Sequence, residues 1–150
     1  MTRGHYNIRV YAIILNDQDE ILLSDERRNG HSFTKFPGGG MEWGEGMKDC
    51  LKRELEEEMG LSAIVGELLY VNDFFQKSAF RDTDQLISFY YLIDEINFEA
   101  IKCWEHPIPM VDDGEAFRWV KRSELTQEMV TFPVDSIVVS LLREGNSQKV

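Results

Sequence analysis

The hydrophobic and polar positions of the chain divide it into short strand-like runs and two helical stretches. Residues 7–17 (NIRVYAIILND) and 85–94 (QLISFYYLID) are rich in β-branched and aromatic side chains, which favours strands. Residues 21–26 (ILLSDE) follow the turn-like NDQDE, so we expect them to pair with the first strand in a hairpin. Two further strands are predicted at 62–75 and 116–120.

The two helical stretches lie at 44–60 (GEGMKDCLKRELEEEMG) and 133–145 (PVDSIVVSLLREG). The first has a glycine at each end, of which Gly60 suits a C-terminal cap, and the second opens on Pro133, which a first helical turn tolerates. Strands mixed with two helices predict an α+β domain or a layered α/β/α domain. The remaining segments are predicted to be loops at 76–84 and 104–115 and a frayed tail at 146–150.

Composition narrows the class of protein. A chain of 150 residues is expected to form a single domain, 1–150, and no run approaches the length of a membrane-spanning helix. The net charge of −11 disfavours nucleic acid as a partner, because binding its backbone needs a basic surface. Cys50 and Cys103 have no metal-site spacing, so Cys50 is expected to be a buried, reduced thiol in a cytoplasmic protein.

Four glutamates crowd the end of the first helical stretch. At about 100° per residue, Glu54, Glu57 and Glu58 share one face of the helix, whereas Glu56 points away. An apolar stripe that can pack on a sheet lies beside them: Leu51, Leu55 and Met59. The carboxylates are therefore predicted to face a cleft.

Like charges four residues apart repel one another on a bare helix, and a divalent cation reverses the sign of that interaction. Ligands that are all oxygen favour hard ions, Mg²⁺ first, with Mn²⁺ or Ca²⁺ as alternatives. The alternative is a solvated charged face with a Lys52–Glu56 pair. Upstream, Gly38, Gly39 and Gly40 form either a phosphate-binding turn or an ordinary turn.

These residues carry a family resemblance. The stretch from Gly39 to Leu61 matches the box G-x5-E-x7-R-E-U-x-E-E-x-G-U, in which U is a bulky aliphatic residue, and so resembles the Nudix hydrolases. The matching positions are Gly39, Glu45, Arg53, Glu54, Leu55, Glu57, Glu58, Gly60 and Leu61. The resemblance implies an α/β/α sandwich with a mixed central sheet and flanking helices.

The same resemblance implies a metal-dependent pyrophosphohydrolase that cleaves a phosphoanhydride bond of a nucleotide. In this sequence Glu54, Glu57 and Glu58 would be the metal ligands. Glu45 and Arg53 would support them by holding loop and helix together. Glu54 or Glu57 would take the proton from the attacking water, unless an acid from a loop does so.

Some relatives of this kind add a metal ligand before a late strand that contains a tryptophan. In this sequence the place is VDDGEAFRWV, where Glu115 is the first candidate, with Asp112 and Asp113 behind it. The alternative is that Glu115 is an ordinary loop acid.

Other side chains give weaker signals. Four aromatic residues are candidates to stack on a base, although each is more typical of a core: Phe74, Phe75, Phe80 and Trp104. Four basic residues are candidates to bind outer phosphates, although each is more typical of a solvated surface: Arg27, Arg28, Lys35 and Arg81. Three histidines form no cluster and are expected on the surface: His5, His31 and His106.

The leading hypothesis is an enzyme that acts on a nucleoside diphosphate derivative or a nucleoside triphosphate. The alternatives are a catalytically silent nucleotide-sensing module and a structural Ca²⁺-binding helix. ADP-ribose, nucleotide sugars, dinucleoside polyphosphates, oxidised dNTPs and capped RNA all remain open as substrates. A homodimer is expected from base rates alone.

Overall fold

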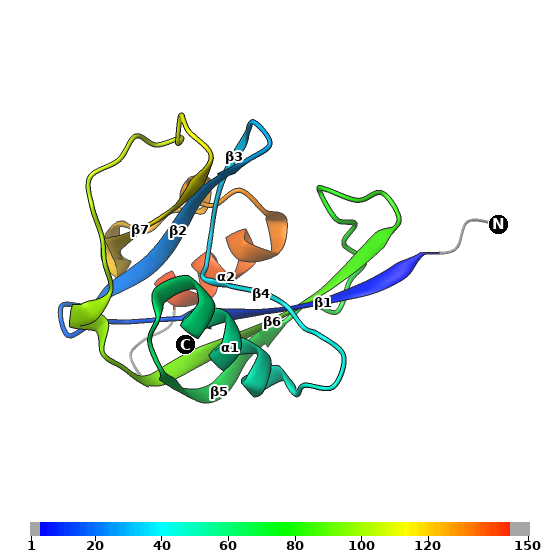
Figure 1. The fold of residues 1–150 in the computed structure, drawn as a ribbon, viewed down its shortest axis with the longest axis horizontal. Helices are drawn as coiled ribbons and strands as arrows, with labels where there is room; N and C mark the ends of the chain where they lie inside the picture. Colours follow the sequence, from blue (N-terminus) through cyan, green and yellow to red (C-terminus); the bar gives the residue numbers. More distant parts are fainter. Residues whose placement is uncertain (1–3, 145–150) are drawn as a thin grey trace.

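The structure is a computed structural model that describes residues 4–144. Within that range, seven strands form a four-stranded and a three-stranded sheet, and two α-helices flank them (Figure 1). The strands are β1 (His5–Ile13), β2 (Glu20–Arg28), β3 (His31–Lys35), β4 (Gly38–Gly40), β5 (Ala63–Val71), β6 (Asp84–Ile96) and β7 (Gly114–Lys121). The helices are α1 (Met47–Met59) and α2 (Pro133–Glu144), with short 3-10 helices at Phe98–Ala100, Arg122–Glu124 and Gln127–Met129.

The larger sheet has the strand order β4-β1-β6-β5 and the smaller one β3-β2-β7. Strand β1 runs parallel to β6 and antiparallel to β4, so the larger sheet is mixed. Together with the flanking helices this confirms the predicted α+β sandwich.

Strand β1 supplies both hydrophobic cores, because successive side chains of a strand point to opposite faces. Val10 and Ala12 are buried in the core beneath α1, together with Leu51 and other residues. Tyr11 and Ile13 point the other way, into the core beneath α2. The alternation along one strand therefore holds both helices to the sheets.

The predicted hairpin between residues 7–17 and 21–26 is wrong. The turn brings the two segments together only at an isolated bridge between Leu15 and Ile21. Both edges of β1 are taken by β4 and β6, whereas β2 pairs with β3 and β7. The chain therefore crosses from one sheet to the other after β1.

The three glycines form strand β4 rather than the predicted turn, and β3 was not predicted at all. Gly38 has φ of 142°, and a Cβ there would lie 2.1 Å from Val10 O. Glycine at this position therefore lets β4 approach β1 closely. Strand β3 is short and mixes polar with apolar residues, so it gave little periodic signal.

Helix α1 has the cap that the sequence predicted. Gly60 has φ of 71°, in the left-handed region, and its backbone N–H donates to Glu56 O. Leu51 and Leu55 are fully buried, and each contributes on the order of 2 kcal/mol through removal of apolar surface from water.

The loops predicted at 76–84 and 104–115 are confirmed apart from their last residues, since β6 begins at Asp84 and β7 at Gly114. The tail predicted at 146–150 lies outside the described residues. Within residues 4–144, neither helix has the length and apolar character needed to cross a bilayer.

Candidate active site

The glutamates of α1 differ in exposure although they share one face of the helix. The Glu54 side chain is 14% exposed and the Glu57 side chain 59%. Glu58 Oε1 is buried and has no hydrogen-bond partner. One carboxylate of the group therefore has a buried oxygen that the protein leaves unsatisfied.

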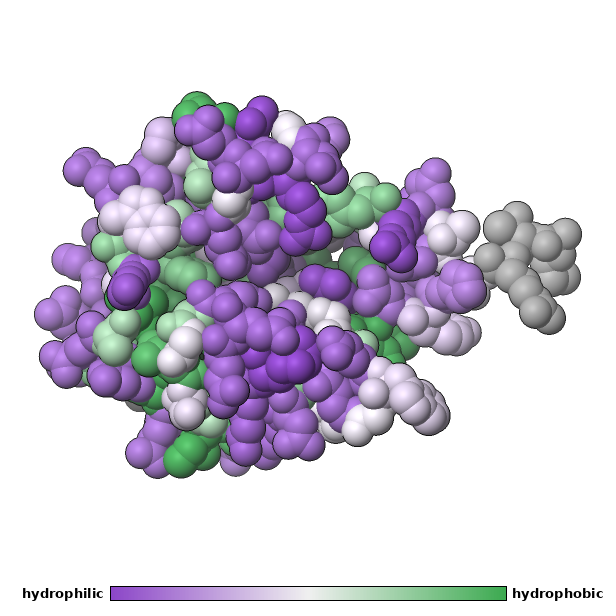
Figure 2. Space-filling model, viewed as in Figure 1, coloured by the Kyte–Doolittle hydropathy of each residue, from purple (hydrophilic) through white to green (hydrophobic). Residues whose placement is uncertain are grey.

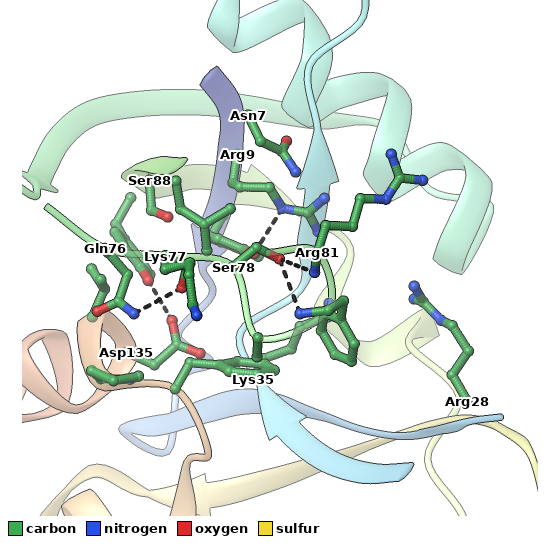
Figure 3. Close-up of a pocket in the computed structure, with 18 residues that line it drawn as sticks. Asn7, Arg9, Arg28, Lys35, Gln76, Lys77, Ser78, Arg81, Ser88 and Asp135 are labelled. Atoms are coloured by element: carbon green, nitrogen blue, oxygen red, sulfur yellow. Dashed lines mark hydrogen bonds between the residues drawn. The ribbon is translucent and has the colours of Figure 1, made fainter. Parts of the chain in front are cut away.

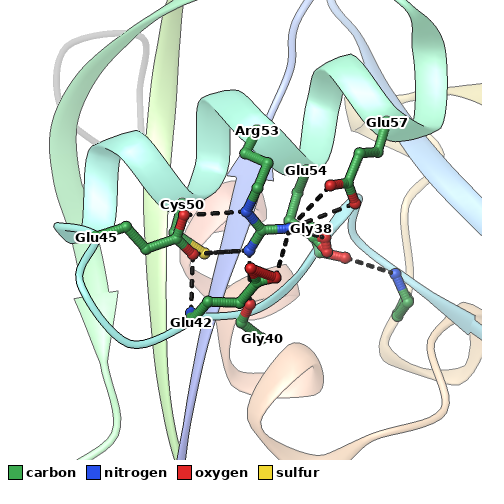
Figure 4. A network of polar contacts seen from close by, with 9 residues as sticks. Gly38, Gly40, Glu42, Glu45, Cys50, Arg53, Glu54 and Glu57 are labelled. Carbon is green, nitrogen blue, oxygen red and sulfur yellow. Dashed lines mark hydrogen bonds and ion pairs between the residues drawn. The ribbon is translucent and has the colours of Figure 1, made fainter.

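Arg53 ties the helix to the preceding loop (Figure 4). Its Nη2 donates to Glu45 Oε1 at 2.7 Å and to Gly40 O at 3.0 Å, and its Nε donates to Glu45 Oε2 at 3.0 Å. The guanidinium, helped by the Glu42 backbone N–H, lowers the pKa of Glu45 to about 2. Glu45 is thus an ionised partner of Arg53 at neutral pH.

The same guanidinium reaches the acidic face of the helix. Nη1 of Arg53 lies 3.3 Å from Glu57 and 3.6 Å from Glu54. The cation offsets repulsion among these carboxylates and also turns Glu57 toward the loop (Figure 4).

Gly39 lets Glu54 lie against β4. A Cβ on Gly39 would be 2.1 Å from Glu54 Oε1, closer than nonbonded atoms can approach. Any side chain at this position would push the Glu54 carboxylate away from the sheet. The second glycine of the run is therefore required by the packing of the candidate site.

Two strands of the smaller sheet bring further acids to this region. Glu115 lies on β7 opposite Glu26 on β2, and Ser24 donates to Glu115 Oε2 at 2.7 Å. Glu115 therefore lies in a strand and not in the preceding loop. Asp113 stays in the loop, where it pairs with Arg27 at 3.5 Å.

The four acids Glu26, Glu54, Glu58 and Glu115 are called the acidic centre below. Burial, together with the charges of Glu115, Glu54 and Glu26, raises the pKa of Glu58 to about 8 against the opposing charge of Lys35. Burial, and then the charge of Glu26, likewise raises the pKa of Glu115. The carboxylates therefore act on one another although they come from three elements.

Lys35 is the cation of this centre. Its side chain is 5% exposed, and Nζ lies 3.0 Å from Glu26 Oε2. Burial acts to lower the pKa of Lys35, but the charges of Glu26 and Glu58 raise it above its ordinary value. The predicted solvated position of Lys35 is wrong, because its ammonium neutralises buried carboxylates that no periodic pattern connects to it.

Among residues 4–144, no group of three or more His, Cys, Asp and Glu side chains has an arrangement that could hold a metal ion. Arg53 engages Glu57, and Lys35 engages Glu26. Two observations nevertheless fit a hard cation: the donors are all carboxylate oxygens, and Glu58 Oε1 is buried without a partner. The residues present therefore suit a divalent cation in their chemistry.

A cavity of about 300 Å³ adjoins the acidic centre. Figure 2 shows a hollow on this face of the molecule, bordered by hydrophilic residues. Strand β1, the ends of β2 and β3, the loop 76–81 and the start of α2 line the cavity (Figure 3). Its basic lining residues are Arg9, Arg28, Lys35, Lys77 and Arg81. A protein with a net charge of −11 therefore gathers five basic residues around one cavity.

Asp135 is an acidic residue of the cavity lining that sequence reasoning missed. It is 2% exposed, and Tyr90 donates a short hydrogen bond to its Oδ1 (Figure 3). Oδ2 is buried without a partner. Burial raises the pKa of Asp135 to about 7. An Asp two residues into a helix is common, so the sequence carried no signal for this role.

Other sequence expectations are corrected by burial. The four aromatic residues expected in the core are exposed, by 40% to 68%: Phe74, Phe75, Phe80 and Trp104. They lie in loops, where no core covers them. His5 and His31 are exposed as predicted, but the His106 side chain is only 6% exposed because it packs on Asp25.

The model of the NUDIX domain matches residues 5–139. The chain belongs to the Nudix family. An 8-oxo-dGTP diphosphatase of Haemophilus influenzae is 38% identical over 118 residues, which cover 76% of this chain and 75% of that protein. An RNA pyrophosphohydrolase of Roseobacter denitrificans is 25% identical over an alignment that covers 94% of this chain and 92% of that protein.

A solved MutT structure, from work on Aliivibrio salmonicida and Vibrio cholerae, has a TM-score of 0.65 and 26% identity. It covers 93% of this chain and 98% of that one. These similarities confirm the predicted family and the prediction of a hydrolase acting on acid anhydrides.

Proposed function

We propose that this Nudix hydrolase is a metal-dependent pyrophosphohydrolase whose substrate is a nucleoside triphosphate or a related small nucleotide. The observation that carries the proposal is the contact between the cavity and the acidic centre. Lys35 and Arg28 both line the cavity, and both pair with Glu26, at 3.0 and 3.2 Å. A ligand in the cavity therefore extends directly toward the carboxylates.

Glu54, Glu57, Glu58 and Glu115 are the proposed metal ligands, with Mg²⁺ first and Mn²⁺ as the alternative. A divalent cation supplies charge stabilisation for the phosphates and lowers the pKa of a bound water. Arg53 and Glu45 orient the helix that carries three of these ligands, in the manner of supports that keep metal ligands in place.

Basic residues at the mouth of the cavity suit the negative charge of a polyphosphate. The Arg28 side chain is 62% exposed although it pairs with Glu26, and Arg81 is also exposed, so both can reach a ligand. The role expected of Gly38, Gly39 and Gly40 in substrate binding stays a prediction. What supports it is their position, between β1 and Glu54.

The nucleobase is proposed to lie in the cavity. The cavity volume of about 300 Å³ can hold part of a nucleoside, and the lining combines aromatic side chains with polar groups that point into the cavity. Phe80 and Phe132 lie with ring centroids 5.9 Å apart at one side, and Asp135 presents its unpartnered oxygen at another. The similarity to an 8-oxo-dGTP diphosphatase favours a purine deoxynucleoside triphosphate as the first substrate to test.

Glu54 and Glu57 both remain candidates for the base that takes a proton from the attacking water. Replacing the base with glutamine abolishes turnover while leaving most metal affinity. Replacing a residue that serves only as ligand weakens both. Mn²⁺ titrations of Glu54→Gln and Glu57→Gln therefore separate the two roles.

Two other functions have weaker support. A nucleotide-sensing module is disfavoured because the box is intact and the named relatives are hydrolases. The similarity to an RNA pyrophosphohydrolase suggests hydrolysis at the 5′ end of RNA as a second function. The net charge of −11 disfavours it, because it repels a long polyanion.

The test is a hydrolysis screen with Mg²⁺, with Mn²⁺ and with chelator. The panel comprises dNTPs, 8-oxo-dGTP, ADP-ribose, nucleotide sugars, dinucleoside polyphosphates and 5′-triphosphate RNA. We expect a nucleoside monophosphate and pyrophosphate from a triphosphate, and no product with chelator. Glu57→Gln should abolish turnover, and the exposed Glu56→Gln on the opposite face of the helix is its matched control. Full activity in chelator would contradict the metal assignment.

A further inference from the structure

The segment from Lys102 to Asp113, called the strap below, crosses the outside of the smaller sheet before it enters β7 (Figure 1). It begins beside β7, where Cys103 forms a bridge with Phe117. Farther along it reaches the β2–β3 end of the sheet, where Met110 O accepts from Ser32 Oγ at 2.8 Å. Its last residue lies two positions before Glu115.

His106 anchors the middle of the strap. Its Nε2 lies 2.9 Å from Asp25 Oδ2, and its Nδ1 lies 2.8 Å from Trp104 O. A carboxylate oxygen and a carbonyl oxygen are both acceptors, so both bonds form only when each ring nitrogen carries a proton. The side chain is 6% exposed, and its bond to Asp25 is partly buried. The two contacts together match the imidazolium form.

Asp25, the partner of His106, is the hub of the outer face. Its carboxylate also accepts from Thr34 Oγ1 at 2.5 Å and from Arg118 Nε at 2.7 Å, so one group connects β2, β3, β7 and the strap. Its neighbour Glu26 points to the opposite face of β2, into the acidic centre.

We propose that His106, as an imidazolium bound to Asp25, is a positioning residue for Glu115: it fastens the strap to the sheet and so fixes the start of β7. The consequence for catalysis rests on the proposed function, in which Glu115 is a metal ligand. Glu115 itself is held by its pairing with Glu26 on β2 and by the hydrogen bond from Ser24, so His106 acts on it through the strap that leads into β7.

The charged groups that face His106 decide the direction of its pH dependence. The hydrogen bond to Asp25 raises the pKa of His106, burial opposes it, and the carbonyl of Trp104 adds to the increase. Arg118 on β7 opposes protonation through its charge. Because the docked pKa exceeds the ordinary value of about 6.5, docking is fully favoured below that pH and is lost as pH rises through the docked pKa.

Hydrogen exchange tests the anchor without relying on activity. We expect the amides of residues 102–117 to be protected in the wild type at about pH 6. At about pH 8.5 protection should fall beyond the intrinsic change, because the imidazolium that holds the strap has lost its proton. His106→Gln can still donate to Asp25 but carries no charge, so it should show low protection at both pH values. The exposed His5→Gln is the matched control and should behave as the wild type.

Metal binding tests the link to Glu115. At about pH 6, His106→Gln should weaken Mn²⁺ binding severalfold, and it should add little to the loss caused by Glu115→Gln, because both changes remove the same ligand. Unchanged strap protection in His106→Gln, or additive losses in the double variant, would overturn the inference. If the wild type bound no Mn²⁺ while exchange at 114–117 still followed His106, the positioning role would stand and the metal assignment of the proposed function would fail.

Discussion

Replacement of Asp135 by Asn should stabilise the protein at alkaline pH relative to acidic pH. Asp135 is buried in the first turn of α2, where Tyr90 satisfies one oxygen and the other has no partner. Burial raises the pKa of its carboxyl from 3.8 to about 7. The folded state therefore holds this proton more tightly than the unfolded state does.

The size of the effect follows from that difference in pKa. Ionised Asp135 costs the folded state nothing below about pH 4. The cost grows by about 1.4 kcal/mol for each pH unit up to pH 7 and is constant above it, at about 4 kcal/mol. Asn cannot ionise, so the variant does not bear this cost. Its amide nitrogen would take the position of Oδ2, where it has no hydrogen-bond partner, and this costs about 1–3 kcal/mol at every pH. Between about pH 5 and pH 8, the variant should therefore gain about 2–3 kcal/mol relative to the wild type.

Urea unfolding at the two pH values, followed by far-UV circular dichroism, measures this change. Asp82→Asn is the matched control, because the Asp82 side chain is 95% exposed. Its free energy of unfolding should follow the wild type at both pH values. An equal difference between Asp135→Asn and the wild type at both pH values would refute the reasoning, since it would show that Asp135 does not titrate in this range in the folded state.

Three further predictions follow from local contacts. Gly39→Ala should destabilise the fold by about 1–3 kcal/mol and abolish most turnover, because the new Cβ would collide with the Glu54 carboxylate. Gly46→Ala is the control: its Cβ would make only ordinary contacts, so unfolding and activity assays should show no change. Arg53→Lys should lower kcat at least tenfold in steady-state kinetics, because one ammonium cannot reproduce the paired bonds of the guanidinium; a wild-type kcat would contradict the clamp. In a thiol-labelling assay of the native protein, exposed Cys103 should react and Cys50 should not, because burial raises the pKa of Cys50 to about 12; Cys103→Ser should remove the reaction.

The parts of the site that lie on one helix were predictable from the sequence. Helical periodicity places Glu54, Glu57 and Glu58 on one face, and the structure confirms that arrangement. It also shows that the three side chains differ in exposure, which the periodicity did not predict. The β-branched and aromatic residues of 7–17 likewise predicted the strand β1. These features depend on neighbours within a few positions, which a periodic pattern records.

The parts that depend on distant segments were not predictable. Lys35 is buried because β2 brings Glu26 to it, and His106 is buried because the strap crosses Asp25. Neither residue belongs to a pattern, since its partner is set by the pairing of strands rather than by spacing. The hairpin prediction failed for the same reason: both edges of β1 pair with strands outside the predicted hairpin, β4 and β6.

Lys35 lines the cavity proposed to hold the nucleotide, and its ammonium group also neutralises the carboxylates beside that cavity. Under the proposed function, selectivity for the base and the charge of the acidic centre are therefore not independent. A substitution of Lys35 that enlarges the cavity or changes its polarity will also remove the positive charge that neutralises Glu26 in the acidic centre. Altered substrate choice is better sought at Phe132 or Gln76, which line the same cavity without an ion pair to the acidic centre.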